Sequence, residues 1–272
     1  MSPTTTAAGS AVVTGAGRGI GRAVAQRLVQ RGYAVVVTDV DGDSARRTAE
    51  EIGAVAGVRQ DVREEDSHTE VARAAGEHGP LAVWVNNAGV GDDGTLAELD
   101  SAAIDRLVEV NLRGTIWGMR AALAGFGEGS DVGDIINVAS LSGLGPVPGL
   151  AVYAATKAAV VSLTASVAAE TPRRVRVHAV LPDGVDTDMV AGMRPGGSAK
   201  ALVHSGGRLL SVDEVARAAV GMIGSRRVLR TVPAWRGGLM RAGALAPSGS
   251  AGLFPVMAAL GRRVMTRSNT RS

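Results

Sequence analysis

Cysteine is absent from this chain of 272 residues. Disulfide bonds and thiolate metal sites are therefore excluded, and the cellular compartment has to be inferred from other features. The four histidines are dispersed along the sequence and lack the spacing of a zinc site. We therefore predict no bound metal.

Two kinds of targeting segment are also missing. Residues 1–9 are small and polar, and they lack the basic-then-apolar order of a secretion signal. No apolar run approaches the roughly 18 residues that a transmembrane helix needs. We expect a soluble, cytoplasmic protein whose N-terminal segment, residues 1–9, is flexible.

Acidic residues are missing from the end of the chain. Residues 226–272 contain nine arginines and no aspartate or glutamate, although the net charge of the whole chain is only +3. Such a basic tail can contact anionic lipid, nucleic acid or an acidic partner, or it can pack on the acidic body of its own chain. It lacks the interleaved aromatic residues of a base-stacking surface, so we predict no nucleic-acid binding. A weak contact with a membrane surface stays open.

What the sequence does contain is a regular alternation of apolar runs and helical segments over residues 10–232. Strands are predicted at 10–14, 33–38, 55–60, 81–85, 134–139, 174–180 and 228–232. Helices are predicted between them, the first ending at residue 31 and the others at 43–52, 64–78, 99–123, around Tyr153 to 170, and at 211–223. This alternation predicts a single-domain α/β Rossmann fold, with a doubly wound parallel sheet and helices on both faces.

Two later segments depart from this alternation. Residues 191–207 are rich in Gly, Ser and Ala, and we expect them to form a mobile active-site lid. Residues 233–272 form a basic C-terminal extension, in which the apolar run 253–260 either folds as an amphipathic helix or remains loose.

A glycine-rich turn follows the first predicted strand. It reads Gly15-Ala-Gly-Arg-Gly-Ile-Gly21 and leads into a helical pattern. Glycine lets the backbone approach a ligand closely, and a helix N-terminus offers free N–H groups to a pyrophosphate. Asp39 ends the next strand about twenty residues later, where a carboxylate accepts hydrogen bonds from an adenosine ribose and repels a 2′-phosphate. The two features predict a dinucleotide site within residues 10–232.

Tyr153 and Lys157 lie four residues apart on a predicted helix, which places them one turn apart on the same face. A free phenol has a pKa of about 10, and a nearby cation favours its ionised form. Ser140, at a strand end, is placed to hold a substrate oxygen against the phenol. The pattern is weak by itself, but Lys157 is one of only two lysines in a chain that otherwise uses arginine. The arrangement suits proton exchange at an alcohol or carbonyl.

Over residues 9–232 the sequence resembles the short-chain dehydrogenase/reductase family. Thr14-Gly15-x3-Gly19-x-Gly21 is similar to the cofactor turn of that family, and Asn86-Asn-Ala-Gly89 is similar to its strand-four motif. The residues that resemble its catalytic tetrad are Asn111, Ser140, Tyr153 and Lys157.

The resemblance implies a role for each of these residues. Tyr153 would be the general acid/base and Ser140 would position the substrate oxygen. Lys157 would bind the nicotinamide ribose and lower the pKa of Tyr153, while Asn111 would hold a water in the proton relay. The implied cofactor-binding residues are Gly15, Gly17, Arg18, Gly19, Ile20, Asp39, Asp61, Val62, Asn87, Ala88, Gly89, Tyr153, Lys157, Pro182, Val185 and Thr187.

Two residues complicate the resemblance. Arg18 stands where NADP-preferring members of the family often carry a cation. Repulsion of a 2′-phosphate by Asp39 should outweigh one flexible arginine, so NAD is the predicted cofactor. Asp183 follows Pro182 where the family usually has glycine, and it adds a side chain at the edge of the active site.

We predict an NAD(H)-dependent oxidoreductase that interconverts a secondary alcohol and a ketone. Alternatives are an NADP(H)-dependent carbonyl reductase, a catalytically silent dinucleotide sensor and a tail-mediated membrane-surface binding protein. The resemblance implies a homodimer or homotetramer built on the helix faces 99–123 and 149–170. A lipophilic substrate is expected from the small, apolar positions Leu141, Leu144, Val147, Pro148 and Leu150.

Overall fold

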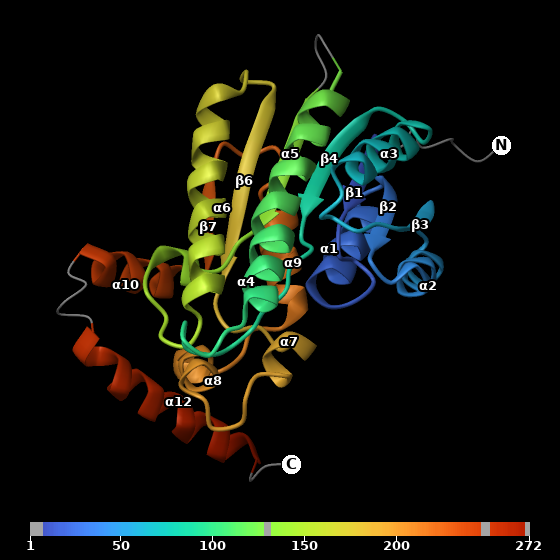
Figure 1. Cartoon of the computed structure of the whole chain (residues 1–272). Helices are drawn as coiled ribbons and strands as arrows, with labels where there is room; N and C mark the ends of the chain where they lie inside the picture. Colours follow the sequence, from blue (N-terminus) through green and yellow to red (C-terminus); the bar gives the residue numbers. More distant parts are fainter. Residues whose placement is uncertain (1–7, 128–131, 246–250, 270–272) are drawn as a thin grey trace.

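The computed structural model describes residues 8–127, 132–245 and 251–269, so most of the predicted flexible segment 1–9 lies outside the described residues. Seven strands form one sheet in the order β3-β2-β1-β4-β5-β6-β7, and every neighbouring pair is parallel (Figure 1). The strands are β1 Ser10–Val13, β2 Ala34–Asp39, β3 Ala56–Arg59, β4 Leu81–Asn86, β5 Gly133–Val138, β6 Val175–Pro182 and β7 Leu229–Val232. The predicted doubly wound parallel sheet is confirmed.

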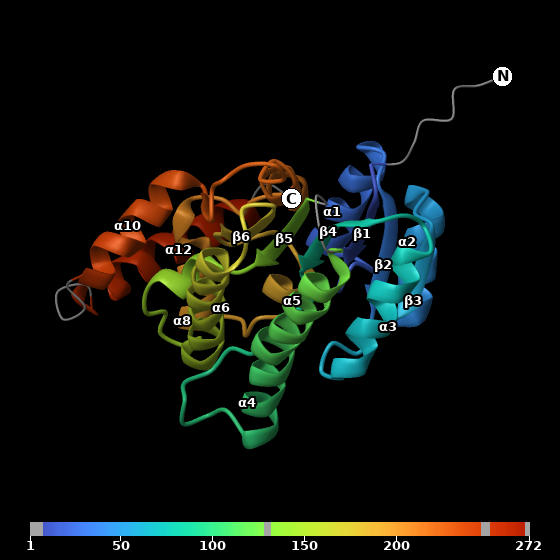
Figure 2. The same ribbon diagram turned by 90° about the horizontal axis from the view of Figure 1, so that it is seen from above.

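Helices cover both faces of the sheet (Figure 2). One face carries α1 (Gly19–Gln30), α2 (Gly42–Ile52) and α9 (Val212–Val220). The other carries α3 (Glu65–Gly76), α5 (Gly114–Gly125) and α6 (Ala151–Glu170). The strand order reverses between β1 and β4, and parallel α/β sheets bind ligands at the carboxyl ends of the strands beside such a reversal.

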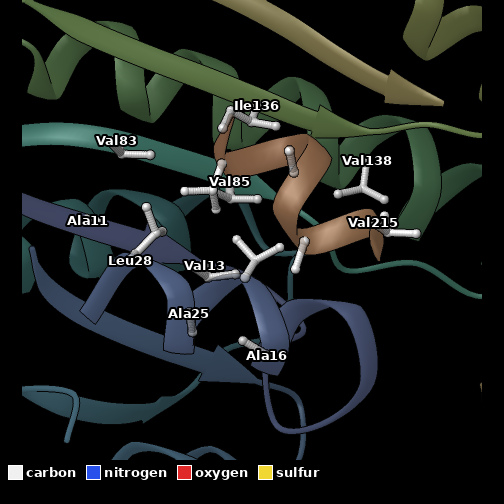
Figure 3. Close-up of a cluster of buried hydrophobic side chains, with 14 of the residues drawn as sticks. Ala11, Val13, Ala16, Ala25, Leu28, Val83, Val85, Ile136, Val138 and Val215 are labelled. Carbon is white, nitrogen blue, oxygen red and sulfur yellow. The ribbon is translucent and has the colours of Figure 1, made fainter. Parts of the chain in front are cut away.

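The two cores follow from the two-residue period of the strands. On β4, Val83 and Val85 point to the α1 and α9 face, while Trp84 points to the α5 face. Figure 3 shows the first of these clusters, in which Leu28 of α1 and Val215 of α9 meet the inner strands. Because both faces are covered, most residues of the central strands are apolar and buried.

The predicted helix 99–123 is not continuous. It begins as α4 (Ser101–Val108), where the side chain of Asp100 accepts a hydrogen bond from the N–H of Ala103. The single-turn π-helix η1 (Glu109–Arg113) then separates α4 from α5. Helical periodicity continues across a π turn, so the sequence pattern did not reveal this break, which contains Asn111.

The segment predicted as a loose lid, 191–207, contains regular structure. It holds the end of α7 (Asp188–Ala191), then α8 (Ser198–Val203) and the 3-10 turn η3 (His204–Gly206). Ala199 and Leu202 of α8 are buried, and their burial supports a helix that the glycine-rich composition did not indicate. A capping box begins α9, in which the side chains of Ser211 and Glu214 each accept a hydrogen bond from the other's backbone N–H.

The C-terminal extension is helical where it is described. It forms α10 (Ala234–Leu245), the short turn η4 (Ala251–Leu253) and α12 (Phe254–Asn269). In Figure 1 both helices lie at one side of the molecule, with α12 crossing α8. The 3-10 turn η2 (Leu141–Leu144), which lies between β5 and α6, packs on α10.

One helix of the described chain, α6, is long and apolar enough to cross a membrane by length and composition, with a mean hydropathy of 1.4. The sequence had suggested no such segment. The helix packs on β6 and η2 and carries Tyr153 and Lys157, so it is part of the α/β core. Only 28% of its apolar window is buried within the chain.

Candidate active site

A cavity of about 810 Å³ opens at the carboxyl ends of the strands. It brings together nearly all predicted site residues, from Gly15 at one end to Tyr153 at the other. The predicted residues that line it are Gly15, Arg18, Gly19, Ile20, Asp39, Asp61, Val62, Asn87, Ala88, Gly89, Ser140, Tyr153, Lys157, Pro182, Val185 and Thr187. Gly17 and Asn111 are not among its lining residues, and each instead supports a residue that is.

The glycine-rich turn is shaped by contacts that exclude larger side chains. A Cβ on Gly15 would lie 2.6 Å from Cα of Ala88, and Gly15 and Gly19 have positive φ values of 59° and 58°. L-residues with side chains rarely adopt such values. The turn delivers the N-terminus of α1, with its free N–H groups and positive potential, to the cavity.

Asp39 is fixed at the end of β2 by two backbone donors. The N–H of Gly17 donates to Oδ2 at 3.0 Å, and the N–H of Asp41 donates to Oδ1 at 3.1 Å. A Cβ on Gly17 would lie 2.9 Å from Oδ2, so a larger residue at position 17 would clash with the carboxylate in this position. Gly17 therefore orients the residue that is predicted to recognise the adenosine ribose.

Arg18 is directed across the cavity mouth. Its guanidinium forms a 3.3 Å ion pair with Asp188 at the start of α7, and both side chains are more than three-quarters exposed. Asp61, predicted to lie near the cofactor, is paired with Arg63, whose hydrogen bonds lower the pKa of the Asp61 carboxyl. Arg18 and Arg63, which line this end of the cavity, are therefore both paired with carboxylates.

The motif at the end of β4 ties the sheet to the glycine-rich turn. Oγ1 of Thr14 accepts hydrogen bonds from the N–H groups of Asn87 and Ala88, each at 3.1 Å. In turn, Nδ2 of Asn87 donates hydrogen bonds to the carbonyl oxygens of Thr14 at 3.0 Å and Gly15 at 2.8 Å. These bonds hold the cavity floor in one conformation.

Tyr153, Lys157 and Ser140 meet on the opposite wall. Nζ of Lys157 lies 5.8 Å from the centroid of the Tyr153 ring and donates to the carbonyl of Val138 at 3.0 Å. Burial lowers the pKa of Lys157 to about 8. Oγ of Ser140 accepts from the N–H of Ser142 at 3.2 Å, which fixes the serine at the end of β5.

The predicted lowering of the Tyr153 pKa is not seen in the structure. Burial raises the pKa of the phenol above its ordinary value of 10.0, and the hydrogen bond with Ser140 opposes this only in part. The ammonium of Lys157 lies towards the face of the ring, where it does little to stabilise charge on the phenol oxygen. The phenol is therefore neutral at pH 7 in the protein alone.

Asn111 acts on the neighbouring backbone. It is fully buried, its Oδ1 accepts from the N–H of Val90 at 2.8 Å, and its Nδ2 donates to the carbonyl of Val90 at 2.9 Å. A Cβ on Gly89 would lie 3.3 Å from Asn111 Oδ1 and 3.5 Å from Lys157 Nζ. Asn111 thus anchors the loop after β4 beside the lysine, and its predicted role in holding a relay water stays a prediction.

Arg236, in the C-terminal extension, was missed from the sequence. Its Nε donates to Oδ2 of Asp183 at 2.7 Å, and its Nη2 donates to Oγ of Ser205 at 3.1 Å. Arg236 and Asp183 line the cavity with side chains only 6% and 14% exposed. The unusual Asp183 was a signal of a special contact, but nothing in the sequence indicated its partner 53 residues away.

The end of the cavity beyond Tyr153 is apolar. Three elements supply its side chains: the loop after β5, the segment around α8 and the C-terminal extension. The residues are Leu141, Pro146, Val147, Leu150, Met193, Leu202, Val203, Met240, Phe254 and Met257. Of the positions predicted for a lipophilic substrate, Leu141, Val147 and Leu150 line the cavity, whereas Leu144 and Pro148 are not among its lining residues.

The donor set fits a nicotinamide dinucleotide. A helix N-terminus suits a pyrophosphate, a fixed carboxylate at the end of β2 suits ribose hydroxyls, and a buried ammonium suits a second ribose. Gly19 leaves open space where a Cβ would project, so the backbone there is accessible to a ligand.

Comparison with known proteins agrees with this geometry. The family model for short chain dehydrogenases matches residues 10–197. The chain is 38% identical over 180 residues to a sorbitol dehydrogenase of Cereibacter sphaeroides, an alignment that covers 65% of this chain and 70% of that protein. It is 40% identical over 215 residues to a cis-4-hydroxycyclohexanecarboxylate dehydrogenase of Sinomonas cyclohexanicum, covering 76% and 86% of the two chains.

A solved structure extends the similarity further along the chain. A short chain dehydrogenase/reductase from Burkholderia phymatum, determined in complex with NAD, superposes with a TM-score of 0.77 at 28% identity, covering 91% of this chain and 95% of that one. On both sequence and structure, this chain belongs to the short-chain dehydrogenase/reductase family.

Proposed function

We propose that the protein is an NAD(H)-dependent oxidoreductase that interconverts a secondary alcohol and a ketone. The observation that carries the proposal is the convergence of Ser140, Tyr153 and Lys157 on one cavity whose other end holds Asp39. The two relatives described above are named as dehydrogenases of hydroxylated compounds, which supports the same reaction class.

The proton chemistry is assigned to Tyr153. In ketone reduction the neutral phenol donates its proton to the developing alkoxide, and in alcohol oxidation the phenolate accepts the hydroxyl proton. Ser140, which hydrogen-bonds the phenol, holds the substrate oxygen at the same point. When bound, the nicotinamide supplies the hydride acceptor or donor.

Lys157 and the loop after β6 are assigned to positioning. The buried ammonium binds the ribose next to the nicotinamide. Pro182, the last residue of β6, and Val185 and Thr187 of the following loop lie at the cavity edge and hold the carboxamide. Gly15, Gly19 and the N-terminus of α1 bind the pyrophosphate.

NAD is favoured over NADP by the charges around Asp39. A 2′-phosphate would meet this carboxylate at hydrogen-bond range, and the next two residues, Val40 and Asp41, offer no cation. Arg18 pairs with Asp188, and because both side chains are exposed, an ion pair from Arg18 to a 2′-phosphate would contribute little to offset the repulsion by Asp39. An NADP(H)-dependent carbonyl reductase remains the alternative.

A lipophilic substrate is favoured by the apolar end of the cavity. Met240, Phe254 and Met257 of the C-terminal extension complete a wall whose other members are aliphatic. Methionine side chains adapt to ligands of different shape, so the wall suits a bulky cyclic or branched alcohol.

A homo-oligomer is favoured by α6. An apolar helix with only 28% of its window buried in one chain leaves a face that a second copy can cover. Trp117 of α5, sandwiched between Arg113 and Arg120, lies on the neighbouring helix. Sedimentation velocity of the full chain would distinguish a monomer from the proposed dimer or tetramer.

The proposed reaction is tested with purified protein, NAD⁺ or NADP⁺, and a panel of secondary alcohols that includes isopropanol, cyclohexanol and cyclododecanol. Formation of NADH, measured by absorbance and faster than formation of NADPH, supports the proposal. Tight NADH binding without turnover of any panel member, in either direction, would instead favour the dinucleotide sensor.

A further inference from the structure

The C-terminal extension exposes an unusual share of the apolar surface. Among the described residues, eleven large apolar side chains are exposed, and six of them belong to α10, η4 or α12. These six are Trp235, Leu239, Leu245, Leu253, Val256 and Leu260. The other five are scattered singly over the rest of the described chain, as is normal for a soluble protein surface.

On α12 the two faces are used differently. The inner face packs on α8, with Ala258 only 6% exposed and Gly261 so close that a Cβ would lie 1.7 Å from the carbonyl oxygen of Ala201. On the outer side, Leu253 at the end of η4 is followed at three- and four-residue intervals by Val256 and Leu260 of α12, and each is about half exposed. The packing of α12 on the protein therefore does not account for its outer apolar stripe.

Cations border this stripe. Arg262 and Arg263 are exposed at its C-terminal end, and Arg241 is exposed on α10. No acidic residue occurs anywhere in residues 226–272, so no carboxylate of the extension offsets these charges. Trp235 and Leu239, four residues apart on α10, add an exposed aromatic and an aliphatic side chain. Apolar groups rimmed by arginine, with a tryptophan at the edge, are the composition of interfacial membrane-binding helices.

Electrostatics decide between two occupants of this surface. In a symmetric dimer formed through the stripe, each copy would present the same arginines to its partner, and like charges would be brought together. An anionic bilayer instead attracts the arginines and accepts the apolar side chains. We propose that the outer faces of α10 and α12 dock reversibly on the surface of an anionic phospholipid bilayer.

The position of α12 links this surface to the cavity. Phe254 and Met257 line the cavity, while Leu253 and Val256, their neighbours in the chain, point to solvent. A single helix thus separates the apolar end of the cavity from the docking face. The inference does not depend on the proposed reaction, because vesicle binding is measured without substrate.

The test is co-sedimentation of the full chain with vesicles of phosphatidylcholine alone and of phosphatidylcholine mixed with phosphatidylglycerol. The wild-type protein should bind the anionic vesicles and lose binding as salt is raised. Arg262→Gln combined with Arg263→Gln should weaken binding by roughly 25-fold, since each arginine near such a surface contributes about fivefold. Arg46→Gln with Arg47→Gln, an adjacent exposed pair on α2, is the matched charge control and should bind like wild type.

A second pair of variants tests the apolar part. Leu253→Ser with Leu260→Ser should reduce binding to anionic vesicles, whereas Leu96→Ser, at an exposed leucine outside the extension, should not. NADH binding followed by fluorescence verifies that each variant is folded. The proposal is overturned if the wild type binds neither vesicle, or if both arginine pairs act alike. It is also overturned if Leu253→Ser with Leu260→Ser dissociates an oligomer without affecting vesicle binding, because a second copy would then cover the stripe.

Discussion

Nε of Arg236 donates to Oδ2 of Asp183 at 2.7 Å, joining the C-terminal extension to the loop that follows β6. The carboxylate stands directly after Pro182, beside the residues assigned to the nicotinamide carboxamide. A Cβ on Gly206 would lie 2.7 Å from the same Oδ2, so the turn η3 leaves room for the pair. The charge that Asp183 adds to the cavity edge is thereby neutralised from a distant part of the chain.

Arg236→Met should destabilise the protein by about 3 kcal/mol, because it leaves a nearly buried carboxylate without its cation. Asp183→Gly combined with Arg236→Met removes both charges and should recover most of that loss. Urea unfolding of the single and double variants measures the coupling. Arg241→Met, at an exposed arginine on the same helix, is the control, and equal effects at positions 236 and 241 would contradict the role of the pair.

Asp39→Ser should shift the cofactor preference towards NADP⁺. Removing the carboxylate removes the repulsion of a 2′-phosphate, and the KM for NADP⁺ should fall about tenfold or more while that for NAD⁺ rises. The measurement is KM for both cofactors at a fixed alcohol concentration. Asp43→Ser, four residues further on and exposed, should leave the ratio unchanged. If Asp39→Ser left the ratio of the two KM values unchanged, Asp39 would not be the residue that selects the cofactor.

Much of the fold was predictable because strands buried on both faces are continuous apolar runs, as Val35, Val36 and Val37 illustrate. The cavity residues were equally accessible, since Gly15, Asp39 and Tyr153 belong to short motifs at strand ends or on one helix turn. Local patterns therefore predicted the parallel sheet and most of the candidate site.

The remaining features depend on contacts between distant segments. The break at Asn111 is invisible to periodicity, the helix α8 forms because Ala199 and Leu202 are buried by tertiary packing, and Arg236 finds its partner only in the folded chain. The direction of the Tyr153 pKa was missed for a related reason. The four-residue spacing from Lys157 specifies proximity, but burial of the phenol depends on the whole cavity wall.

Asp134 should make stability depend on pH in the acid range. Burial by itself raises the pKa of this carboxyl, but hydrogen bonds from His178, Arg176 and the N–H of Gly224 outweigh it and hold the pKa below the ordinary value of 3.8. A depressed folded-state pKa stabilises the protein above about pH 4, and this contribution is lost as the pH falls through the folded value.

Asp134→Asn should therefore lower the free energy of unfolding at pH 7 by about 3 kcal/mol and weaken its dependence on pH below 4. Urea unfolding across the acid range measures both effects. Asp134 pairs with Arg176 near the N-terminal ends of β5 and β6, whereas the cavity lies at the carboxyl ends of the strands. The kcat of the folded variant should therefore be retained. A variant as stable as the wild type at neutral pH would show that the network contributes little.

The most direct test of the account is the rate of both reaction directions in Tyr153→Phe, with Tyr33→Phe as the control at the only other tyrosine in the chain. Because burial keeps the phenol protonated at neutral pH, wild-type ketone reduction should be fastest near or below pH 7, and alcohol oxidation should rise in alkaline solution. Tyr153→Phe should lose at least about 100-fold in kcat in both directions while still binding NADH, and Tyr33→Phe should lose neither. Turnover by Tyr153→Phe at the wild-type rate would contradict the assignment of the proton chemistry to this residue.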